Sequence, residues 1–182
     1  MGIFRRNQSK SVLIIDDFRL ETTKSEVKVS ITPEFLELLQ KDGYALDSKA
    51  GSSSSEIETA TYMASYQLWD IPVKITFDNE GIDNKDDFVK SINVKLDWLE
   101  GKKEQVYKKL AAGLLELKNT NWLEEDEASY NEKTFISNIK IHSLDFTIDG
   151  RFELLFNENM IFGGHDISMT INSKLEMEDP TI

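Results

Sequence analysis

Two histidines, His142 and His165, are the side chains of this sequence best suited to acid–base or metal chemistry. A histidine beside carboxylates can act as a general base or as a metal ligand. Asp166 follows His165 directly, and Asp149 and Glu158 are carboxylates that a fold could bring to the same place. Adjacent residues of a strand point to opposite faces, so His165 and Asp166 cannot easily hold one metal ion. A hydrolase or metal-dependent enzyme that uses His165 is therefore an alternative, and a structural histidine is the simpler interpretation.

Other catalytic patterns do not occur. The sequence contains no cysteine, which excludes disulfides, thiolate catalysis and cysteine-ligated metals, and which is compatible with a reducing cytoplasm. Gly163-Gly164 precedes an expected strand instead of a helix, so it does not form a phosphate-binding loop. The apolar run at residues 12–15 is too short for a signal peptide or a membrane span. We expect a cytoplasmic protein with no catalytic residue, cofactor or metal, and no membrane partner.

The net charge of the chain limits the classes of molecule that it can bind. The 182 residues include 33 Asp and Glu against 21 Lys and Arg, a formal net charge of −12. This charge repels phosphate and no basic stripe offsets it, so nucleic acid is an unsuitable partner. The excess is concentrated in residues 51–100, with 10 acids against 4 bases, and in residues 131–182, with 9 against 4. Either the acidity serves solubility, the commoner reason, or it forms a surface for a basic protein partner.

The first half of the chain is predicted to contain several strands. Apolar alternation indicates strands at residues 26–31, 62–69 and 71–77, and residues 12–15 could form another short one. Pro72 has no backbone donor, so its strand should begin there or lie at a sheet edge. Thr32-Pro33 predicts the start of a short helix that Gly43 ends. Residues 48–55, SKAGSSSS, predict a flexible loop.

Two longer helices follow. Asp83 or Asn84 can cap a helix over residues 84–100, and Gly101 separates it from a second helix over 102–118. The two apolar stripes have helical spacing and consist of Phe88, Ile92, Leu96 and Leu99, and of Val106, Leu110, Leu114 and Leu117. Trp122 lies in an acidic loop, where we expect it to fill a gap between helix and sheet. One helical turn is expected at residues 134–138.

The last part of the chain reads as three strands, at residues 139–147, 151–156 and 166–172. The Asp149-Gly150 turn permits a two-residue loop, but that register would mix apolar and charged groups on both faces. A three-residue loop at 148–150 gives one apolar face. Its cross-strand pairs are Phe146 with Phe152 and Leu144 with Leu154, with His142 near Phe156 and Asp145 opposite Glu153.

Together these elements predict an α+β fold, with a mainly antiparallel sheet that packs one face against the helices at 84–100 and 102–118. Residues 1–60 form an N-terminal segment that could belong to the same domain. Residues 61–174 form the main domain, and residues 175–182 a loose acidic tail.

Segments 149–156, DGRFELLF, and 161–167, IFGGHDI, resemble the closing motif of an uncharacterised bacterial family, domain of unknown function twenty-two sixty-two. Its pattern is a DG hairpin, an aromatic strand, Phe-x-Gly-His and a final strand. Residues 117–122 and Phe135 are also similar. The resemblance covers residues 60–172 and is most secure over 115–172.

This resemblance implies a binding module of the kind placed among candidate immunity proteins of toxin systems, and it offers no established catalytic residue. Its motif makes Gly163, Gly164, His165 and Trp122 the candidate site. The leading hypothesis is thus a protein-binding module for a basic partner. The alternatives are the enzyme described above and a scaffold subunit whose sheet edge pairs with itself.

Overall fold

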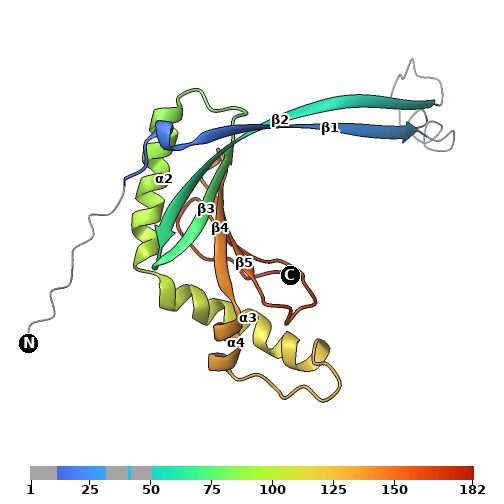
Figure 1. Ribbon diagram of the computed structural model, residues 1–182, viewed down its shortest axis with the longest axis vertical. Coiled ribbons are helices and arrows are strands. Elements are labelled where there is room, and N and C mark those ends of the chain that lie inside the picture. Colours follow the sequence, from blue (N-terminus) through green and yellow to red (C-terminus); the bar gives the residue numbers. More distant parts are fainter. Residues whose placement is uncertain (1–11, 32–40, 42–50) are drawn as a thin grey trace, which may run out of the picture. The chain divides into compact units, whose positions relative to one another are not determined.

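The computed structural model describes residues 12–31, 41 and 51–182. Its elements are η1 (Ile15–Asp17), β1 (Arg19–Ile31), β2 (Gly51–Leu68), β3 (Ile71–Asp78), α2 (Lys85–Glu100), α3 (Lys103–Asn121), α4 (Glu132–Asn138), β4 (Lys140–Phe146), β5 (Phe152–Asn157) and β6 (Ile167–Ile171) (Figure 1). Apart from residue 41, the helix predicted between Thr32 and Gly43 lies outside the described residues.

The chain divides into two compact units. The larger comprises Met1–Leu20 and Thr61–Ile182, and the smaller comprises Glu21–Ala60. Residues 12–20 thus belong with the main unit, whereas the predicted N-terminal segment ran to residue 60. The smaller unit contains most of β1 and the first part of β2, which are neighbours in the sheet.

The predicted flexible loop at 48–55 is wrong for residues 51–55, which belong to β2, and residues 48–50 lie outside the described part. Serine-rich composition favours a loop only when no neighbouring strand is available. Here β1 is adjacent to β2 in the sheet and can satisfy its backbone groups.

The sheet has the order β1-β2-β3-β4-β5-β6. The pairs β2/β3, β4/β5 and β5/β6 are antiparallel, and β3/β4 is parallel. A parallel pair needs a long crossover, which α2, α3 and α4 provide. The prediction of an α+β fold with a mainly antiparallel sheet is confirmed.

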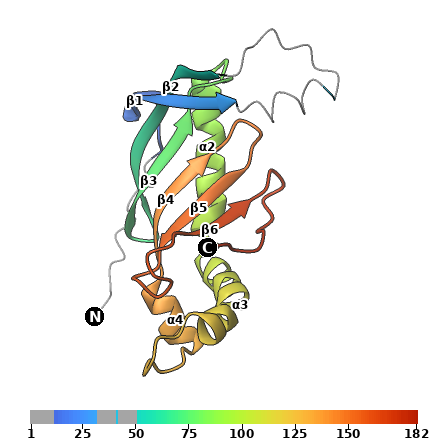
Figure 2. The same ribbon diagram turned by 90° about the vertical axis from the view of Figure 1, so that its right-hand side faces the viewer.

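Helix α2 lies along one face of this sheet, behind β3, β4 and β5 in Figure 2. Of the two predicted caps, Asn84 is the one used, because its side chain accepts a hydrogen bond from the Asp87 amide. The buried residues of α2 are Val89, Ile92, Leu96 and Leu99. They meet the alternate buried residues of the strands, among them Ile75, Phe77, Leu154 and Met169. The opposite face of β3–β5, which carries Lys74, Thr76, Asp145 and Glu153, is called the open face below.

The register predicted for the β4–β5 hairpin is confirmed. Phe146 pairs with Phe152, Leu144 with Leu154 and Asp145 with Glu153. The Thr147 amide donates to the Arg151 carbonyl at 3.1 Å, which closes a three-residue loop with Gly150 at φ +87°. One detail differs, because a bulge between Ile141 and Ser143 makes Ile141, and not His142, the partner of Phe156.

The β2–β3 hairpin turns through Trp69 and Asp70, both in the left-handed region at φ 55° and 65°. Trp69 therefore lies in the turn and not in the predicted strand, and its Nε1 donates to the Leu99 and Glu100 carbonyls. Pro72 is the second residue of the interior strand β3, so the edge alternative is wrong. Its missing donor is tolerated because β4 pairs with β3 only from Lys74 onward.

Two terminal predictions are wrong. No strand forms at residues 12–15, because residues 12–14 have no regular secondary structure and a 3-10 turn begins at Ile15; Leu13 is hydrogen-bonded to Asn93 of α2. Residues 175–182 are not loose, because Thr181 and Ser168 exchange two backbone hydrogen bonds of 2.9 and 3.0 Å. The tail thus extends the edge at β6, and its contacts could not be read from its acidic composition. No described helix is long and apolar enough to cross a membrane.

Candidate functional site

The turn between β5 and β6 holds the motif residues and is organised by Glu158. This side chain is 4% exposed, and its carboxylate accepts hydrogen bonds from the amides of Phe162 and Gly164. Asn159 and Met160, at φ 49° and 66°, are left-handed residues other than glycine. A positive φ strains the backbone of any residue other than glycine, and this strain persists only where surrounding contacts maintain it. A buried carboxylate therefore holds a tight turn in one conformation.

The candidate residues from the motif come together at this turn. The Trp122 ring packs edge-on against Phe162 and His165, with centroid separations of 5.7 and 5.3 Å. Gly163, at φ +66°, lies under Trp122, since a Cβ there would stand 3.5 Å from the indole. Gly164 supplies one of the amides that bind Glu158. Trp122 thus packs against this turn, whereas the sequence predicts that it fills a gap between helix and sheet.

The enzyme alternative finds no support in this geometry. Glu158 is engaged by backbone amides, and Asp149 lies at the other end of β5, in the β4–β5 loop, where it binds Thr147 and Arg151. The six residues of β5 separate these ends by about 20 Å at the usual rise per strand residue. His165 is exposed, and within the described residues no three His, Asp or Glu side chains form a group that could hold a metal ion.

An ion pair between buried Lys118 and partly exposed Glu127 lies next to Trp122. The Lys118 side chain is 2% exposed and donates to the Trp122 carbonyl at 2.7 Å and to Glu127 at 2.6 Å. Glu127 also accepts from the Tyr130 hydroxyl at 2.7 Å. Hydrogen bonds from Lys118 and Tyr130 lower the pKa of Glu127 to about 2, and the bond to Glu127 raises the pKa of Tyr130 to about 12.

Sequence reasoning missed this network, although one signal was present. The spacing Val106, Leu110, Leu114 continues to position 118, so Lys118 occupies the buried stripe of α3. A lysine in such a place needs an anionic partner. The acidic run 124–127 that follows α3 supplies this partner, Glu127.

The open face carries a second group of residues, centred on Asp145. Asp145 accepts a hydrogen bond from Thr76 at 2.8 Å and lies directly opposite Glu153. Burial raises the pKa of Asp145, the charges of Asp78 and Glu153 raise it further, and Thr76 and Lys74 partly oppose the rise. This carboxylate is therefore held in an unfavourable electrostatic environment.

Asp145 also lines an acidic hollow of about 390 Å³ at the ends of β3 and β4, together with Asp78 and Glu80. Phe146 and Ile148 add apolar surface, and Ile148 is 60% exposed. Asp78 accepts a hydrogen bond from Thr61, and among the described residues none of the three carboxylates forms an ion pair. The sequence did not reveal this hollow, because it depends on the parallel pairing of β3 with β4.

Comparison with known proteins identifies a family and no individual relative. No curated protein and no solved structure matches the chain. Residues 47–182 match the family described as "Uncharacterized protein conserved in bacteria (DUF2262)", and this range includes the Glu158 turn, Trp122 and the acidic hollow. As the match covers well over half of the sequence, the chain belongs to this bacterial family.

Proposed function

We propose that this chain is a non-enzymatic protein-binding module that receives a basic side chain of a partner protein in the acidic hollow. The observation that carries the proposal is that Asp78, Glu80 and Asp145 line one open hollow without an ion pair to any described lysine or arginine. Natural surfaces intersperse charges of both signs, so three carboxylates around one hollow are a recognisable feature.

The hollow suits a lysine or arginine side chain. Burial and then the like charges of Asp78 and Glu153 destabilise the ionised form of Asp145, and a cation brought by a partner would stabilise it. The apolar stem of such a side chain can lie against Ile148 and Phe146 while its charged end meets the carboxylates. We therefore expect the hollow to make a salt-sensitive contact with a positively charged protein.

The charge of the whole chain supports the same class of partner. A net charge of −12 attracts a basic protein over several ångströms and raises the association rate. A small acidic protein that binds and neutralises a basic toxin, an immunity protein, is one such module. We propose this role for the chain, with the product of an adjacent gene as the first partner to examine.

The experiment compares two variants of equal net charge. Glu80→Gln combined with Asp145→Asn removes two charges from the hollow. Glu116→Gln combined with Glu125→Gln removes two charges from exposed positions elsewhere. Each tagged protein is co-expressed with the neighbouring gene product and purified at low and at high salt. Circular dichroism verifies that both variants are folded.

The wild-type chain and the Glu116/Glu125 control should both retain the partner at low salt and release it at high salt, because salt screens exposed charges. The hollow variant should lose the partner at low salt. Equal retention by the two variants would show that only total charge matters. Absence of a partner under both salt conditions, with the neighbouring gene product and with a whole bacterial lysate, would refute the binding role.

A further inference from the structure

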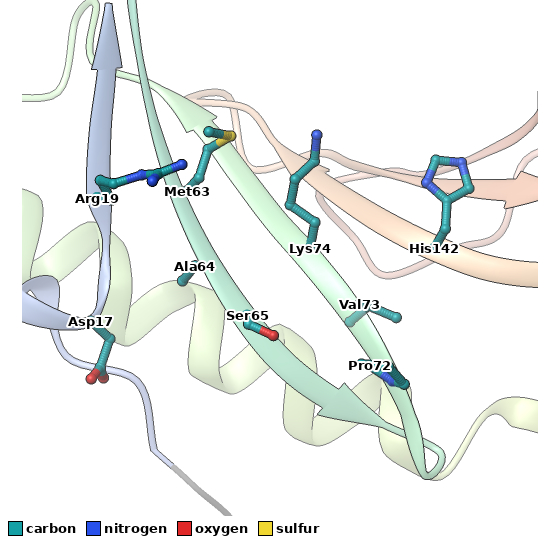
Figure 3. A pocket seen from close by; sticks show the side chains of 9 residues that line it. All are labelled: Asp17, Arg19, Met63, Ala64, Ser65, Pro72, Val73, Lys74 and His142. Carbon is teal, nitrogen blue, oxygen red and sulfur yellow. The ribbon is translucent and has the colours of Figure 1, made fainter.

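A second hollow, on the open face, is lined by three basic residues and one acid. It has a volume of about 500 Å³ and is lined by nine residues, including Arg19, Lys74 and His142 (Figure 3). In a chain with 33 acidic residues and 21 basic ones, a hollow that gathers a guanidinium, an ammonium and an imidazole contrasts with the charge of the whole.

The strands direct these side chains to one place. Lys74 on β3 is the register partner of Ser143 on β4 and of Ser65 on β2. Figure 3 shows Lys74 and His142 pointing to the same side of the sheet, and the guanidinium of Arg19 extending from β1 over Met63. Three neighbouring strands and β1 thus contribute to a single surface.

The β4 bulge places His142 in this hollow. Ile141 and Leu144 are both buried and pair with Phe156 and Leu154, so two residues, His142 and Ser143, lie between two inward positions. Bulges redirect side chains and are common next to functional sites. Ser143 Oγ and His142 Nδ1 lie 3.1 Å apart, and this hydrogen bond holds the exposed imidazole in position.

One acid, Asp17, also lines the hollow. The Asp17 carboxylate accepts a hydrogen bond from the Ile14 amide at 2.8 Å. In Figure 3 it points away from Lys74 and His142. The part of the hollow around Lys74 and His142 therefore presents basic side chains, with apolar parts from Met63 and Pro72. Pockets of roughly 300–1,000 Å³ accept small organic molecules, so this volume exceeds what a bare inorganic anion needs.

We propose that this hollow binds a small organic anion, whose phosphate or carboxylate group is held by Lys74 and His142 and whose apolar part lies along Met63 and Pro72. Lysine and arginine form charge-assisted hydrogen bonds with both kinds of oxyanion. The proposal is independent of the basic partner assigned to the acidic hollow, because it rests on different side chains and on a ligand of opposite charge.

The test uses three probes of similar size at low ionic strength: phenyl phosphate, phenylacetate and neutral benzyl alcohol. Calorimetric or NMR titration of the full chain measures each Kd. Phenyl phosphate or phenylacetate should bind with a Kd of about 1 mM or lower, and benzyl alcohol at least about tenfold more weakly. The tighter of the two anions identifies the preferred oxyanion.

Two variants locate the binding. Lys74→Gln and His142→Gln change exposed side chains, and each should raise the Kd of the anion by about tenfold, the loss expected for a charge-assisted hydrogen bond. Lys133→Gln removes the same charge from an exposed position on α4 and should change the Kd by less than about twofold. Wild-type binding no tighter than about 10 mM would overturn the proposal. So would equal binding of benzyl alcohol, or equal losses in Lys74→Gln and Lys133→Gln.

Discussion

Replacing Glu158 by glutamine tests whether one buried carboxylate holds the β5–β6 turn. Glutamine has the same shape, but it keeps one acceptor oxygen and puts an NH₂ donor where the second oxygen was. In the wild-type protein both oxygens accept from backbone amides, those of Phe162 and Gly164. Glu158→Gln therefore leaves one buried N–H facing another donor.

The cost can be worked out from these two hydrogen bonds. Bonds to a charged acceptor contribute about 1.5–3 kcal/mol each, and a neutral one contributes about 1 kcal/mol. Glu158→Gln loses one charged bond outright and weakens the other to a neutral one. Since Glu158 is only 4% exposed, water cannot replace the lost acceptor without opening the turn. We expect a loss of about 2–5 kcal/mol in the free energy of unfolding.

Urea denaturation measures this difference, with linear extrapolation to zero denaturant. Glu125→Gln makes the same chemical change at an exposed position and should alter stability by less than about 0.5 kcal/mol. Amide hydrogen exchange gives a local reading, because Phe162 and Gly164 should lose protection while β4 keeps it. A Glu158→Gln protein as stable as Glu125→Gln, with these amides still protected, would refute the assigned role of Glu158.

Three further predictions concern other parts of the larger unit. The Glu127–Tyr130 hydrogen bond stabilises the fold fully between pH 4.5 and 10; this contribution is lost as pH falls toward 2, where Glu127 becomes protonated, and as it rises toward 12, where Tyr130 ionises. The difference in urea midpoint between wild type and Tyr130→Phe should shrink in both outer windows, and a constant difference would contradict the assignment. Gly150→Ala, at φ +87°, should cost about 1–2 kcal/mol, whereas Gly101→Ala, at φ −81°, should cost nothing. Equal melting temperatures for these two variants would contradict the left-handed turn. Asp145→Asn should raise the free energy of unfolding at neutral pH, because the raised pKa means that folding disfavours the charged form there, and a loss of stability would contradict this.

Local patterns predicted much of the larger unit. The β4–β5 register follows from apolar alternation, because shifting it by one residue would place Phe146 opposite a charged residue. The sequence offers Asp83 and Asn84 as alternative caps of α2, and the structure shows that Asn84 is the cap. The predictions for residues 12–15, 51–55 and 175–182 are wrong. In these places backbone partners from distant parts of the chain decide the conformation.

The candidate site was also predicted only in part from the sequence. The motif brought Trp122 and His165 to attention, and the structure places their rings side by side. The spacing of α3 places Lys118 in the buried stripe, but its partner Glu127 and the two amides that bind Glu158 depend on a loop path and a turn geometry that spacing does not determine. The hollows are less predictable still, because each gathers side chains from several strands.

The acidic charge, the absence of cysteine, the α+β class and the C-terminal hairpin are properties that the sequence by itself determined, since each depends on composition or on short-range periodicity. Tertiary structure alone decided which charges share a surface. Parallel pairing of β3 with β4 puts Asp145 beside Asp78, and the bulge in β4 puts His142 beside Lys74. Strand pairing joins residues that lie about seventy positions apart, and electrostatic interactions depend on distance in space and not on distance along the chain.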